Sequence, residues 1–198
     1  ESYYYNSKNF NHCCHICFDD GNRSVYENAF PILREMKVPA TLFVSPKIIG
    51  EKSNYWFQEL EYLRKLIDDE AVKVLIAKTL GCDYGQIKKY KILSLFRCMN
   101  LKDIFLVINT IKEKLNLEIK MTYNITDEQL HEMNNSKLIT IGAHTMNHPI
   151  LSNETDDDAE KEIEQSINEL SRLLHTEIKY FAYPNGKVEL DYNVREQA

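Results

Sequence analysis

Short runs of apolar and β-branched residues alternate with helical patterns along most of this chain. The runs at 14–18, 40–44 and 138–143 each end in polar or turn-forming residues. Such runs predict buried strands. A fourth strand is predicted at 178–182, before the turn sequence Tyr183-Pro184-Asn185-Gly186.

Helical patterns occupy the segments between these strands. After the first strand we expect a helix that begins at Ser24, with Glu27 as the partner in a capping box. Its apolar face is predicted to be Val25, Ala29, Ile32, Leu33 and Met36. Further helices are predicted from Thr126 to about Asn135 and from about 155–158 to Leu174. Strand, helix and strand within about thirty residues indicate a parallel βαβ unit, so the fold class is α/β.

Between about 54 and 117 the pattern is helical throughout. Apolar residues recur at helical spacing from Trp56 onward, and the pattern breaks at Gly81 and Gly85. We interpret this block as a helical insertion whose apolar residues are mainly packing positions. Because it follows a strand end, we also consider the hypothesis that it covers a substrate groove and selects the substrate.

Size and charge limit the classes of function. The 198 residues suffice for one domain, and the net charge of −6 without a basic cluster argues against a nucleic-acid partner. Apolar runs fall short of the ~18 residues of a membrane span. All five cysteines are expected to be reduced, which favours a cytoplasmic over a secreted location.

Two clusters of polar side chains follow predicted strands. Asp19-Asp20-Gly21 comes after the strand at 14–18, and His144 and His148 come after the strand at 138–143. Ligands and metals collect where parallel strands end. Asp and His together suit zinc with an open coordination position. The pattern therefore predicts metal-assisted hydrolysis.

A rival metal site is conceivable at His12, Cys13, Cys14, His15 and Cys17. Successive side chains of a strand point to opposite faces, so these residues cannot all converge on one ion. We interpret them instead as small buried strand residues.

Three segments resemble the first three motifs of the polysaccharide deacetylases (carbohydrate esterase family 4), in the family's order. They are Phe18-Asp19-Asp20-Gly21, His144-Thr145-Met146-Asn147-His148-Pro149 and Phe181-Ala182-Tyr183-Pro184-Asn185-Gly186. The similarity covers about 10–50 and 125–190, and the helical block lies outside it. It implies a single catalytic domain over 1–198, built as a deformed parallel (β/α) barrel. Since only four strands are predicted, we expect the barrel to be incomplete at the C-terminus.

The resemblance implies roles for the first two motifs. Asp19 would be the general base. Asp20, His144 and His148 would bind one divalent metal ion, usually zinc in this family. A water activated by the metal would then attack the acetamide carbonyl. Thr145 is expected to orient the histidine loop.

The third motif would hold the substrate. The resemblance implies that the backbone N–H of Asn185 stabilises the oxyanion and that Tyr183 and Pro184 bind substrate. Ala182 occupies a position where the family often has an arginine paired with the catalytic aspartate, and Arg23 is a candidate substitute. The family's later Leu-x-His motif, which supplies the general acid, has no match after Gly186.

These features favour a hydrolase that removes acetyl groups from N-acetylated sugars of a polysaccharide or oligosaccharide. The alternatives are a hydrolase of cyclic amides or ureides and a carbohydrate-binding relative without catalysis. Retention of Asp19 argues against pure binding, because binding alone needs no free carboxylate beside the metal ligands. The polymer, the acetyl position and the oligomeric state are left open.

Overall fold

The computed structural model describes residues 14–51, 53–120 and 123–185. Its sheet contains the strands β1 (Cys17–Phe18), β2 (Ala40–Val44) and β3 (Ile139–Ala143), all parallel and in the order β1-β2-β3. The second and third strands have the predicted positions, whereas the first is shorter than its apolar run. Parallel pairing brings the carboxyl ends of all three strands to one edge.

The predicted fourth strand joins the sheet only at one parallel bridge, between Ala143 and Phe181. Ala143 N–H donates to Tyr180 O at 2.8 Å, and Ala182 N–H donates to Ala143 O at 2.9 Å. Gly142 permits this close approach, since a Cβ there would lie 2.6 Å from the Phe43 ring and 3.0 Å from Tyr180 O.

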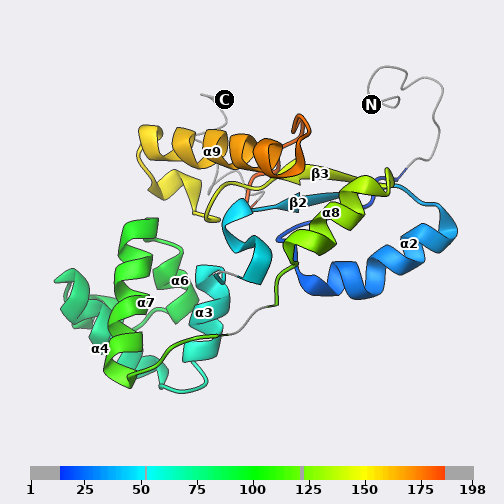
Figure 1. Cartoon of the computed structure of the whole chain (residues 1–198). Helices are drawn as coiled ribbons and strands as arrows, with labels where there is room; N and C mark the ends of the chain where they lie inside the picture. Colours follow the sequence, from blue (N-terminus) through cyan, green and yellow to red (C-terminus); the bar gives the residue numbers. More distant parts are fainter. Residues whose placement is uncertain (1–13, 52, 121–122, 186–198) are drawn as a thin grey trace.

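Helices cover both faces of the sheet (Figure 1). α9 (Asp156–Leu174) lies on one side, and α2 (Phe30–Met36) and α8 (Asp127–Asn135) lie on the other. Thr126 caps α8 with its side chain, as the sequence predicted, and Thr155 caps α9 at the start predicted for that helix. The core between these layers is apolar, and Leu42 and Val44 on β2 have no exposed surface.

The helix after β1 differs from the prediction. Ser24 is already helical and makes no capping hydrogen bond, while Asn22 Oδ1 accepts from Ser24 N–H at 2.9 Å. A π-helical turn, η2 (Val25–Ala29), precedes α2. Because this turn changes the number of residues per turn, the 3.6-residue period does not continue through it. Ile32 and Met36 are consequently 57% and 67% exposed instead of buried.

The block predicted to be helical forms its own core. It contains α3 (Trp56–Leu63), α4 (Asp69–Leu80), α5 (Tyr84–Ile87), α6 (Ile92–Phe96) and α7 (Leu101–Leu115). Their apolar faces pack on one another in a cluster distinct from the sheet core. Figure 1 shows the block beside the carboxyl ends of the strands, beyond the short 3₁₀ segment η3 (Pro46–Glu51).

The cysteine-rich segment at 14–17 lies at the surface. Cys14, His15 and Cys17 are exposed, so the interpretation of these three as buried strand residues was wrong. His12 and Cys13, the other two residues of that cluster, lie outside the described residues. Cys14, Cys17, Cys82 and Cys98 are free thiols. No helix within the described ranges is long and apolar enough to span a membrane.

Candidate metal centre

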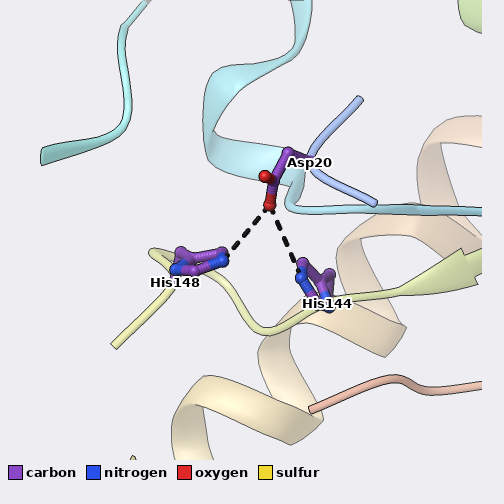
Figure 2. Close-up of side chains that lie close together, drawn as sticks. All are labelled: Asp20, His144 and His148. Atoms are coloured by element: carbon purple, nitrogen blue, oxygen red, sulfur yellow. Dashed lines mark ion pairs between the residues drawn. The ribbon is translucent and has the colours of Figure 1, made fainter. Parts of the chain in front are cut away.

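Side chains from two strand ends meet at the carboxyl edge of the sheet. Figure 2 shows the Asp20 carboxylate between the imidazoles of His144 and His148. Asp20 Oδ1 lies 3.5 Å from His144 Nε2 and 3.2 Å from His148 Nε2. One ligand atom from each residue lies within 4.8 Å of the others. Among the described residues, this is the one group with the residue types and spacing of a metal site.

Unusual backbone conformations aim these side chains. Asp20, Thr145 and His148 all have positive φ, at 67°, 63° and 57°. Such values are uncommon outside glycine and cluster at functional sites. Gly21 also has a positive φ of 61°, and a Cβ there would lie 2.6 Å from Val44 Cγ2. Glycine at 21 therefore lets the Asp20 turn sit directly against β2.

A backbone carbonyl fixes the orientation of the His144 imidazole through its Nδ1 atom. Its Nδ1 lies 2.9 Å from Ala182 O. A carbonyl oxygen only accepts, so Nδ1 carries a proton and donates it to Ala182 O, which turns Nε2 toward Asp20. Position 182 thus contributes its backbone to the site, whatever its side chain. From the sequence, position 182 had been identified only by the absence of an arginine side chain.

His148 is fixed through its backbone and its ring. Its N–H donates to Thr145 Oγ1 at 3.1 Å, and its carbonyl accepts from Trp56 Nε1 at 2.9 Å. The rings of Tyr55 and Phe57 pack edge-on against its imidazole, with centroids 5.3 and 5.0 Å away. The first turn of the helical block therefore forms one wall of this centre.

Hydroxyl groups of three buried side chains hold the backbone of the two motif loops. Thr145 Oγ1 donates to His144 O at 2.5 Å, in line with the loop-orienting role expected for Thr145. Ser45, directly after β2, donates to the same oxygen at 3.0 Å. The Tyr55 hydroxyl donates to Asp20 O at 3.0 Å. Burial raises the pKa of the Tyr55 phenol, which keeps its proton available for this bond.

Glu162 on α9 holds the tip of the histidine loop. Its carboxylate accepts from Met146 N–H at 3.0 Å, from Asn147 N–H at 2.8 Å and from Asn147 Nδ2 at 2.6 Å. Three donors on one carboxylate fix the loop between the two histidines.

The three side chains satisfy simple requirements for a divalent cation. Asp20 Oδ1 and His144 Nε2 are buried without a hydrogen-bond partner among the described residues. Burial alone would raise the pKa of the Asp20 carboxyl, but the adjacent imidazoles of His144 and His148 outweigh burial and hold that pKa below its usual range. Tetrahedral zinc with ligand distances of about 2.1 Å separates its ligands by about 3.4 Å. The separations of 3.5 and 3.2 Å between Asp20 Oδ1 and the Nε2 atoms of His144 and His148 match that value.

A cavity of about 390 Å³ opens beside Asp20 and His148, and Pro184 and Asn185 line it. Asn185 Nδ2 also donates to Pro149 O at 3.4 Å. Asp19 is exposed next to Asp20. Tyr183 packs on Leu151 and Ala159 and does not line this cavity.

Several contributors had not been identified from the sequence: Ser45, Tyr55, Trp56 and Glu162. Ser45 follows the end of β2, so the rule that sites gather at strand ends could have suggested it. The other three come from helical patterns that look like ordinary packing or solvent-facing positions. No local signal marks them.

The sequence matches the family described as polysaccharide deacetylase over residues 7–76 and 82–198, nearly its whole length. The chain belongs to this family. A stretch of 50 residues is 42% identical to a poly-beta-1,6-N-acetyl-D-glucosamine N-deacetylase of Staphylococcus aureus, and covers 25% of this chain and 16% of that protein.

Two solved structures match over most of this chain. The Streptococcus pyogenes deacetylase PplD, solved in complex with acetate, has a TM-score of 0.50 at 18% identity. The match covers 93% of this chain and 53% of PplD, so the chain spans about half the length of that protein. IcaB from Ammonifex degensii has a TM-score of 0.48 at 20% identity, with 93% and 56% covered. The predicted α/β fold of the polysaccharide deacetylase barrel type is confirmed by the family and by the likeness to PplD.

Proposed function

We propose that this chain carries the metal centre of a hydrolase that removes acetyl groups from N-acetylated sugars of a polysaccharide or oligosaccharide. The observation that supports it most is the meeting of Asp20, His144 and His148 within 4.8 Å, in a member of the polysaccharide deacetylase family. The short match to the staphylococcal deacetylase makes poly-β-1,6-N-acetylglucosamine the first substrate to test.

In this proposal Asp20, His144 and His148 hold one divalent cation, with zinc as the first choice. When bound, the cation supplies a Lewis acid that polarises the acetamide carbonyl and lowers the pKa of water. Asp19 is the exposed carboxylate next to Asp20 and would not be one of the ligands. Asp19 takes the proton of the attacking water as general base.

The third motif would position the acyl group. The backbone N–H of Asn185 is proposed to donate to the oxygen that becomes negative in the transition state. Pro184 and Asn185 line the cavity that Asp20 and His148 share. Pro184, which lines the cavity, and Tyr183, which packs on Leu151 and Ala159 outside the lining, stay the proposed substrate-binding residues.

The test is acetate release from β-1,6-linked N-acetylglucosamine oligomers by the zinc-loaded chain, compared with the chelated chain. Zinc-dependent release is expected. Ring opening of small cyclic amides without acetate release would support the alternative C–N hydrolase, which the alanine at 182 keeps open. Oligomer binding without any turnover would support a carbohydrate-binding relative.

A further inference from the structure

We propose that the helical block provides a binding subsite for a sugar ring adjacent to the ring that carries the acetyl group. This inference rests on the proposed function. The cavity beside Asp20 and His148 extends across α3 and past α6 to Arg97. The block would therefore contact a part of the substrate that does not react, and favour oligomers over a single acetylated sugar.

The lining of this cavity has an apolar side and a charged rim. Phe57 and Leu60 from α3, Leu93 from α6 and Ile150 after the histidine loop provide the apolar side. Glu61, Arg64 and Arg97 provide the rim. A pyranose ring has C–H faces and a hydroxyl edge, so it matches a lining of this kind, in which apolar walls carry a few polar groups.

Arg97 is the cation of the rim whose side-chain donors are best placed to bind a ligand. Arg64 donates from Nε and Nη2 to the two carboxylate oxygens of Asp69, each at 2.9 Å. Glu61 lies 3.8 Å from Lys65. Arg97 has no ion pair or side-chain hydrogen bond within the described residues. Its guanidinium can therefore donate to hydroxyl or acetamido oxygens of a bound sugar.

The block is tied to the metal centre at several points, so the subsite has a fixed position. Asn153, at the end of η4 (Leu151–Asn153), donates from Nδ2 to Arg97 O at 2.8 Å and to Met99 O at 2.9 Å. Glu154 accepts from Leu101 N–H at 2.7 Å. Together with the bond from Trp56 to the His148 carbonyl, these contacts set the distance from Arg97 to the histidine loop.

The cavity is also large enough. Its volume of about 390 Å³ exceeds what an acetamido group alone would fill. That volume falls in the range of about 300–1,000 Å³ that small-molecule sites occupy. A sugar ring beside the reacting residue would use this space.

The test uses Leu93→Ala and Arg97→Ala in the zinc-loaded chain. Both side chains are exposed, so the fold should tolerate their removal. Leu106→Ala and Lys102→Ala, exposed positions on α7 outside the cavity, are the matched controls. We measure kcat/KM on a β-1,6-linked N-acetylglucosamine pentamer and on N-acetylglucosamine itself. The pentamer-to-monomer ratio should fall about tenfold in each cavity variant and stay at the wild-type value in the controls.

Calorimetric binding of the pentamer to Asp19→Asn chains, with and without Arg97→Ala, separates the subsite from the chemistry. Weaker binding with Arg97→Ala supports the subsite even if the wild-type chain releases no acetate, in which case only the proposed function fails. Acetate release with equal ratios in all four variants overturns the subsite alone. If the chain neither turns over nor binds the pentamer, both the subsite and the proposed function are overturned.

Discussion

The carboxylate of Glu162 on α9 accepts two hydrogen bonds from Asn147, at 2.8 Å from its backbone N–H and at 2.6 Å from Nδ2. Asn147 lies between the two histidines of the proposed metal centre. A helix that supplies no metal ligand therefore sets the shape of the loop that supplies two.

Glu162→Gln should weaken zinc binding by about 10- to 100-fold, the usual effect of losing an outer partner of metal ligands. The glutamine side chain keeps one acceptor oxygen, but its NH₂ group replaces the other acceptor and faces loop N–H donors that it cannot satisfy. Chelator competition measures the affinity. Glu164→Gln, an exposed change on the same helix, is the control and should bind like wild type. Equal affinities in both variants would show that the loop keeps its shape without Glu162.

Trp56→Phe should destabilise the fold by about 1–3 kcal/mol, because the buried carbonyl of His148 loses its donor. Urea unfolding followed by circular dichroism measures this, since Trp56 is the single tryptophan and its fluorescence disappears with it. Tyr62→Phe on the same helix removes a hydroxyl with no hydrogen bond among the described residues, and should change stability little. A stable Trp56→Phe chain would mean that the carbonyl finds another donor.

Gly21→Ala should cost more stability than Gly81→Ala. Both glycines have positive φ, at 61° and 67°, so both variants bear a similar backbone strain of about 1 kcal/mol. A Cβ at 21 also meets Val44 Cγ2 at 2.6 Å, whereas a Cβ at 81 has no neighbour within 4 Å. The excess in chemical denaturation should be about 1–3 kcal/mol, and zinc affinity should fall only in Gly21→Ala. Equal losses of stability in the two variants would show that Val44 on β2 can move away from the added Cβ at no cost in free energy.

Asp19→Asn should keep zinc affinity while kcat falls by about 10²- to 10⁴-fold, the usual contribution of a general base. Asp20→Asn should instead lose zinc. Acetate release and zinc titration on the same preparations separate the two effects. Loss of zinc in Asp19→Asn to the same extent would mean that the roles of the two aspartates are misassigned.

The strands at 40–44 and 138–143 were predictable because β-branched, apolar runs bounded by turn residues are buried in a parallel sheet. The cap at Thr126 was predictable because its side-chain oxygen directly precedes a helical pattern and can accept from a first-turn N–H. The helix after β1 was not. Its π turn interrupts the period from which the burial of Ile32 and Met36 had been predicted.

The grouping of Asp20, His144 and His148 was predictable because both motifs follow strands whose ends meet. Their surroundings were not. Trp56 reaches His148 from the first turn of a helical block, and Glu162 reaches the loop from a helix rich in acidic residues. Neither position differs in pattern from its neighbours, since these contacts depend on tertiary packing alone.

Zinc titration of the metal-free chain tests the central claim most directly. We predict that the wild type binds one zinc ion per chain, and that His175→Ala, which removes an exposed histidine elsewhere, does the same. With free zinc at a hundred times its Kd, the free energy of unfolding should rise by about 2.7 kcal/mol in both chains. His148→Ala should lose both the binding and the stabilisation. Zinc bound by His148→Ala as tightly as by the wild type would contradict the account.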